Sequence, residues 1–415
     1  MSYIKWPVIM AILLFPALSI VLHNAGNTCL YVLLICSIVA LICRCKPMGI
    51  GFGQLLKEYW PLHLAMASLF IAVILNQLSL GAFEARQYDR ALRLAVFAPV
   101  FWIILAAPLK YLKSVQWAFI VGIIAAVIKI YLGTDGGTSR PSNIGFLLII
   151  AFSDIALLLG SMTLLSIGWN SRRDKAVILL KFLIFCVSLY ITILGQSRGT
   201  WIAIPFFVVF GIQFLGGIRI RHKLMVAVLA LVVMMAMFSL SSTIQTRIAE
   251  AKSDVTQYLD GKNVDTSLGI RLQLWRVSWE LFKERPVFGI GRENFSSGLE
   301  EFSSKKMISP VAAAFAHSHN ELIFNMTILG IFGLLANLSI YCVPAYYFGR
   351  EIRHPDRYVR TAAGMGMLLP LGFFIFGLTD LMFFWTVLGG FYCMSVATFL
   401  AIIIKRKKNL EQTDI

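Results

Sequence analysis

The sequence predicts an all-helical integral membrane protein with about twelve transmembrane helices, and two observations support this fold class. Of the 415 residues, 58% are hydrophobic and only 14% are charged, whereas soluble domains carry roughly a quarter charged residues. The apolar residues also form runs of about 20, the length that a helix needs to cross a bilayer. These runs lack the alternation of apolar and polar residues that is typical of barrel strands.

The apolar runs give the expected helices in order. Because the bilayer core offers backbone groups no water, each run is expected to form a helix. The expected spans are 4–22, 28–43, 60–80, 92–108, 114–132, 144–168, 176–195, 199–216, 224–240, 321–343, 361–379 and 382–404. They divide the chain into nine transmembrane helices at 1–240, an extramembrane loop domain at 241–320, and three helices with a basic tail at 321–415.

Basic residues in the short loops indicate the orientation. With the N-terminus in the cytoplasm, the cytoplasmic loops and tail carry twenty Lys and Arg residues and the opposite short loops carry five. This bias predicts that both termini are cytoplasmic and that segment 241–320 faces the outer side, the periplasm in a bacterium. It also accounts for most of the net charge of +16, so we expect no nucleic-acid partner.

The outer segment contains one clear helix signal, at 271–285. Leu272, Trp275, Trp279 and Phe282 recur at helical spacing, and Pro286 ends the run. We expect this apolar face to pack on the membrane domain or to lie at the membrane interface.

Three arginines on the outer side are candidates for binding a phosphate group. Arg198 lies between Gly195 and Gly199 at the mouth between two spans, Arg271 starts the expected outer helix, and Arg292 follows it. An arginine can hold a phosphate through two parallel hydrogen bonds. The alternatives are an interfacial anchor for Arg198 and a solvated helix residue for Arg271.

The segment before the span at 321 carries His317, His319 and Asn320. Three interpretations are open: an interfacial pair with Asn320 as the helix N-cap, a metal site, or a catalytic base near neutral pH. His-x-His has no third or fourth ligand nearby in the sequence, which argues against a metal. We therefore expect no metal and no cofactor.

Other membrane functions have less support in the sequence. Asp154 is the one acidic residue expected deep in a span, where a hydrogen-bonded structural role is the simpler interpretation. A transporter usually shows more such residues, or broken helices in matched halves. The chain has no G-x-x-x-x-G-K-[ST] loop for a nucleotide.

Three motifs on the outer side resemble the O-antigen ligase and polymerase superfamily. In chain order they are Ser197-Arg198-Gly199, the run from Arg271-Leu-Gln-Leu-Trp275 to Pro286-Val-Phe-Gly289-Ile-Gly291, and His319-Asn320 followed after nine residues by Gly330-x-x-Gly333. The resemblance lies within about 195–335. The expected plan of twelve spans with one long outer loop is similar over the whole chain.

The resemblance implies a GT-C-like glycosyltransferase in the bacterial inner membrane, with its active site facing the periplasm. Such a ligase transfers O-antigen from undecaprenyl diphosphate to lipid A–core oligosaccharide, among membrane lipids and without a metal, with inversion at the anomeric carbon. It implies that Arg198 and Arg271, with Arg292 as a further candidate, bind the diphosphate, and that His319 is the base. His317 and Asn320 are secondary candidates. The alternatives are an O-antigen polymerase and, from another class, a polysaccharide flippase or secondary transporter.

Overall fold

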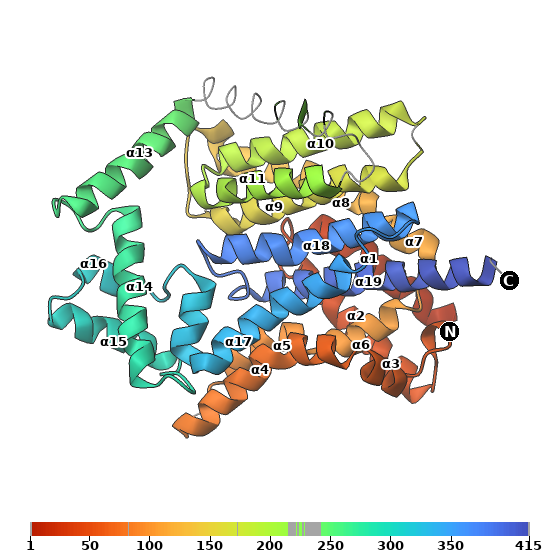
Figure 1. Ribbon diagram of the computed structural model, residues 1–415, viewed down its shortest axis with the longest axis horizontal. Helices are drawn as coiled ribbons and strands as arrows, with labels where there is room; N and C mark the ends of the chain where they lie inside the picture. The colour runs from red at the N-terminus through yellow and green to blue at the C-terminus, as the bar shows by residue number, and fades with distance from the viewer. Residues whose placement is uncertain are drawn as a thin grey trace.

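The computed structural model describes residues 2–81, 83–171, 173–214, 221, 224–225, 228 and 242–413, and these residues are largely helical (Figure 1). The longer helices of the bundle are α1 (Ser2–Leu18), α2 (Ala25–Ile42), α4 (Trp60–Leu80), α8 (Val115–Gly133), α9 (Ile149–Leu165), α10 (Lys175–Leu194), α11 (Arg198–Phe214), α17 (Glu321–Gly349), α18 (Arg357–Gly377) and α19 (Thr386–Thr413). The shorter elements of this part are α3 (Phe52–Glu58), α5 (Ala85–Ala95), α6 (Phe97–Ile104), α7 (Leu109–Lys113), three 3-10 turns at η1 (Pro47–Gly49), η2 (Asp135–Gly137) and η3 (Ser166–Trp169), and the antiparallel pair β1 (Asn143–Ile144) and β2 (Leu147–Leu148).

The fold class predicted from the sequence is confirmed. Within the described residues, eight helices are long and apolar enough to cross a membrane, and α1 and α11 are apolar but shorter. The count of twelve spans stays a prediction. The expected span 224–240 lies outside the described residues, apart from 224, 225 and 228.

The expected span at 92–108 is wrong as a single helix. The chain forms α5 and α6 instead, with a break at Val96. Pro99 explains the break, because proline has no backbone N–H and its ring clashes with the carbonyl four residues earlier. Since α6 is buried among its neighbours, this part of the chain is an internal half-helix of the bundle.

The last long helix before the C-terminal pair, α17, is also broken, at Gly330, so the expected span 321–343 is not one continuous helix. Gly330 has φ 68° and ψ −155°, a conformation that is essentially restricted to glycine. The turn after α14, residues 286–291, fits into the break. The backbone N–H groups of Ile290 and Ile331 donate to Thr327 and Pro286 across it, at 3.1 and 2.8 Å. From α4, the side chain of Asn76 donates to the carbonyl of Phe288 at 2.7 Å.

We expect Gly330→Ala to destabilise the fold. A Cβ at Gly330 would collide with the Val287 backbone, and the backbone conformation alone would cost about 1–3 kcal/mol. Gly211→Ala in α11 is the control, because a Cβ there meets nothing within 4 Å. Thermal unfolding of the purified variants measures the difference. A Gly330→Ala protein with the melting temperature of the control would contradict this account of the break.

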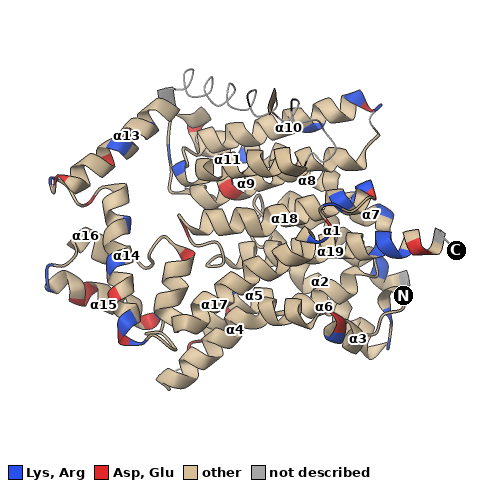
Figure 2. Ribbon diagram, in the orientation of Figure 1, with Lys and Arg blue, Asp and Glu red and all other residues tan. Residues whose placement is uncertain are grey.

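The outer segment folds into α13 (Ser242–Leu259), α14 (Ser267–Glu284), α15 (Glu293–Ser304) and α16 (Pro310–Ala313) at one end of the bundle. Both chain termini lie at the other end (Figure 1). Lys and Arg gather near the termini, while α13–α15 carry charges of both signs (Figure 2).

The expected helix at 271–285 is present as α14, but it starts four residues earlier. The Thr266 side chain caps it by accepting the Gly269 N–H at 3.1 Å, which places Arg271 one turn inside the helix. The predicted packing face is wrong. Leu274, Val277 and Leu281 are buried, whereas Trp279 is 50% exposed.

Candidate active site

The two histidines lie on the turn between α16 and α17, and their position is fixed by the outer helix and the end of α18. Asn320 is the N-cap of α17, as one interpretation of the sequence predicted: its side chain accepts from Ile323 N–H at 3.1 Å. From α14, the Trp275 indole donates to the Ser318 carbonyl at 2.9 Å. His319 itself has φ 52°, an unusual conformation for a residue that is not glycine.

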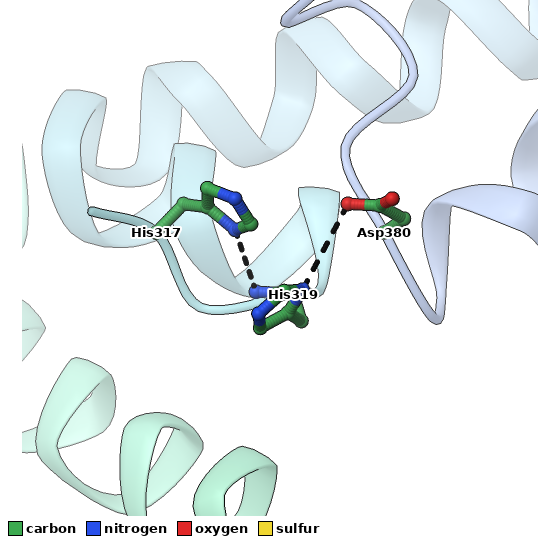
Figure 3. Close-up of side chains that lie close together, drawn as sticks. All are labelled: His317, His319 and Asp380. Carbon is green, nitrogen blue, oxygen red and sulfur yellow. Dashed lines mark hydrogen bonds and ion pairs between the residues drawn. The ribbon is translucent and has the colours of Figure 1, made fainter. Parts of the chain in front are cut away.

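Asp380, in the loop between α18 and α19, faces His319 (Figure 3). The distance from His319 Nδ1 to the Asp380 carboxylate is 3.8 Å, which is longer than a hydrogen bond, and within the described ranges this nitrogen has no hydrogen-bond partner. The Asp380 side chain is 4% exposed and that of His319 is 20% exposed. The sequence analysis did not single out Asp380, which lies at the short connection between the last two expected spans. The available signal was that the last outer loop and the His319 turn were expected on the same side.

His317 has a different environment from His319. Its Nδ1 accepts the backbone N–H of His319 at 3.3 Å, and the two rings lie 4.4 Å apart. Burial, helped by the charge of His319 and opposed by Asp380, lowers the pKa of His317 to about 4. His317 is therefore neutral at neutral pH and supports the turn that presents His319.

The same three residues could also hold a metal ion. One ligand atom each from His317, His319 and Asp380 lies within 4.8 Å of the other two. No third ligand lies near His-x-His in the sequence, but Asp380 supplies one from a distant part of the chain, so the expectation of no metal stays a prediction. A fourth ligand position would remain open to water or substrate.

Arg198 and Arg271 come together beside this turn. Arg198, the first residue of α11, pairs with Asp254 of α13 at 3.4 Å. Arg271 donates to Ser267 at 3.3 Å, and its buried Nε has no hydrogen-bond partner among the residues that the structure describes. Burial lowers the pKa of Arg271, while Asp380 opposes that shift and Arg198 adds to it, so all three charges interact. The arrangement leaves guanidinium donors free for an anion next to His319.

Two further arginines belong to this basic group and were not singled out from the sequence as phosphate ligands. Arg247 of α13 donates to Gln196 at 2.8 Å, next to Arg198. Partial burial, and then the charges of Arg247 and Arg198, lower the pKa of Arg140. The sequence analysis counted Arg140 only among the basic residues of the outer short loops. It did not indicate that Arg247, in the outer segment, lies near Arg198.

The Ser197-Arg198-Gly199 motif is fixed from inside the bundle. The hydroxyls of Thr200 and Ser197 are 2.7 Å apart, and Thr200 is 2.6 Å from the buried carboxylate of Asp154. This is the hydrogen-bonded role expected for Asp154. A Cβ at Gly199 would come within 2.6 Å of the Thr379 hydroxyl. The glycine thus allows the start of α11 to pack against the loop that carries Asp380.

Arg292 does not join Arg198 and Arg271. Its guanidinium lies 4.5 Å from the centre of the Phe384 ring, where Arg90 of α5 also packs, at 3.8 Å. The Phe384 ring is 5.7 Å from that of His317.

Comparisons with known proteins agree with the motifs. Residues 182–338 match a family described as O-antigen ligase. The chain is 27% identical over 281 residues to an uncharacterized protein of Haemophilus influenzae, covering 64% of this chain and 67% of that protein. It is also 25% identical over 235 residues to the O-antigen ligase of Escherichia coli, covering 54% of this chain and about half, 51%, of the ligase. The chain therefore has the helices of a multi-pass membrane protein, and residues 182–338 are similar to the O-antigen ligase family, which supports the resemblance that its three motifs indicated.

Proposed function

We propose that this protein is an O-antigen ligase. In the proposed reaction it transfers a polysaccharide from undecaprenyl diphosphate to the lipid A–core acceptor at the periplasmic face of the inner membrane. The observation that supports this most directly is the His319–Asp380 pair beside Arg271, whose buried Nε has no hydrogen-bond partner in the described part of the chain. A sugar that leaves from a diphosphate and an acceptor hydroxyl that must lose a proton need these two kinds of group together.

The proposed mechanism is a single displacement. Asp380 holds the Nδ1–H tautomer of His319, so that Nε2 can take the proton from an acceptor hydroxyl. The hydroxyl oxygen bonds to the anomeric carbon as the bond from that carbon to the diphosphate oxygen breaks. Undecaprenyl diphosphate leaves with the electron pair, and Arg198 and Arg271 stabilise its negative charge. The anomeric carbon inverts. The His319–Asp380 distance of 3.8 Å would have to shorten in the substrate complex.

Electrophoresis of lipopolysaccharide from a deletion strain tests the proposed function. Loss of a ligase leaves core without O-antigen while lipid-linked polymer accumulates, and the gene on a plasmid restores the ladder. Core that carries one repeat unit would indicate a polymerase instead. Loss of both the ladder and the periplasmic polymer would indicate a flippase.

The proposed orientation gives a prediction of its own. Reporter fusions after Ser253, in α13, should report the periplasm, and fusions after Arg357, at the start of α18, should report the cytoplasm. The reason is the excess of basic residues in the loops on the side of the termini. The reverse pattern would place His319 in the cytoplasm, away from the proposed donor, and would contradict the mechanism.

A further inference from the structure

A pocket next to the histidines has no role in the mechanism above. It has a volume of about 50 Å³ and lies between α4, α5, the first half of α17 and the loop after α18. Its walls are mainly apolar, with Leu69 and Val73 from α4, Ile328 and Leu329 from α17, and Phe383 from the loop. At about 10–15 Å³ for each water molecule, a pocket of this size holds a few waters or one group such as a phosphate, and it is too small for a hydrocarbon chain.

Two arginines are among the residues that line this pocket. Arg90 and Arg292 both line it, and both pack on the ring of Phe384, at 3.8 and 4.5 Å from its centre. Their guanidinium carbons are therefore no more than about 8 Å apart, the sum of these two distances. One phosphate group can contact two guanidiniums at such a separation.

The positive charge of this pair is compensated only in part, because Glu293, next to Arg292 in the sequence, is the one acidic group that acts on the Arg292 charge within the described residues. In the part of the chain that the structure describes, neither arginine forms an ion pair, and the buried Nη1 of Arg90 has no hydrogen-bond partner. Glu293, the nearest acidic neighbour of Arg292, instead accepts a hydrogen bond from Gln87 at 3.0 Å. Two like charges with free donors are unfavourable when partly buried, and an anion between them would remove that cost.

The pair lies close to the proposed catalytic residues. Phe384 separates it from His317 by one ring contact of 5.7 Å. After burial, the charges of both Arg292 and Arg271 contribute to the low pKa of His317. The histidines thus lie within electrostatic range of two separate cationic groups, one around Arg198 and Arg271 and one made of Arg90 and Arg292.

We propose that Arg90 and Arg292 bind a phosphate group of an amphiphile at the pocket beside Phe384. This inference rests on the proposed function, in which the amphiphile is the acceptor glycolipid. The donor diphosphate occupies the Arg198 and Arg271 group, and the acceptor enters from the α4–α5 side with its hydroxyl toward His319. A two-substrate transferase with both substrates in the membrane needs two such sites.

Binding to the purified full-length protein, measured by native mass spectrometry, tests the proposal without requiring turnover. The probes are lipid A–core oligosaccharide, the same lipid after phosphatase treatment, phosphatidylglycerol and undecaprenyl diphosphate. Arg90→Gln and Arg292→Gln should each weaken binding of the phosphorylated lipid A–core by at least about tenfold. Binding of undecaprenyl diphosphate should not change. Arg86→Gln, an exposed arginine on the same helix α5, is the matched control and should have no effect.

The dephosphorylated lipid keeps the test independent of how the variants fold. It should bind the unaltered protein at least about tenfold more weakly than the phosphorylated lipid does, and Arg90→Gln should weaken it no further. The proposal is overturned if the phosphorylated and dephosphorylated lipid A–core bind equally, or if the variants lose binding of undecaprenyl diphosphate instead. It is also overturned if phosphatidylglycerol binds as tightly as lipid A–core and its binding is lost in the same variants. The last result would assign the site to a membrane phospholipid. Failure of the deletion-strain test would remove the ligase assignment but would not alter these binding results.

Discussion

His319→Ala should reduce polysaccharide transfer by about 10²–10⁴-fold, the usual contribution of a general base. The protein should still enter the membrane and bind undecaprenyl diphosphate, since the arginines of that site are intact. Asp380→Asn should also be strongly impaired, because an amide cannot hold His319 in the same tautomer with the same charge. In vitro transfer, normalised to folded protein and measured across a range of pH, gives these rates.

His317→Ala is the comparison that separates the two histidines. His317 holds the His319 backbone at 3.3 Å and is neutral because its pKa is lowered, so its loss should reduce transfer less than the loss of His319. If His319→Ala kept more than about a tenth of the rate, base catalysis by this residue would be excluded on that scale. If the three residues instead held a metal, a strong chelator would abolish activity in the unaltered protein and one divalent ion would restore it.

Arg271→Lys should lose most of the transfer activity although it keeps the positive charge. Lysine offers a point charge, whereas the planar guanidinium can bind two phosphate oxygens at once. Arg271 is well placed for this because its Nε is buried without a partner. The rate should fall by about tenfold or more, and binding of undecaprenyl diphosphate should weaken with it.

Arg276→Lys is the matched control for this experiment. Arg276 lies on the same helix, α14, and is exposed, so the substitution should leave transfer unchanged. Similar losses in both variants would point to a general requirement for α14. Normal transfer by Arg271→Lys would mean that Arg271 acts as a point charge or a structural residue.

The sequence predicted well what depends on local pattern. The expected span 60–80 has the same bounds as α4, and 176–195 is within one residue of α10, because length and apolar composition determine where a helix crosses a membrane. The break at Val96 was hidden, since Pro99 lies in an otherwise continuous apolar run. The buried face of α14 was also misassigned, because several of its faces carry large apolar residues and only the packing partner decides which is covered.

For the candidate site, the motifs located individual residues but not their partners. His319, Arg198 and Arg271 were identified by their motifs, and the structure brings them near one another. Asp380 could not be assigned, because an acidic residue between two spans has the same appearance whether it faces a histidine or the solvent. Arg292 was grouped with the other arginines by its place in the sequence, while the turn after α14 directs it to Phe384.

Because residues 286–291 fill the break in α17, the outer region cannot be separated cleanly from the membrane helices. Backbone hydrogen bonds join residues 286–291 to residues 327–331, and Asn76 ties both to α4. A boundary at residue 320 therefore cuts the chain between two parts that complete each other's backbone hydrogen bonding. An excised fragment of 241–320 would leave the N–H groups of Ile290 and Gly291 without their acceptors. An exchange of outer regions between related proteins would have to carry the 327–331 segment and the residue equivalent to Asn76 along with the loop.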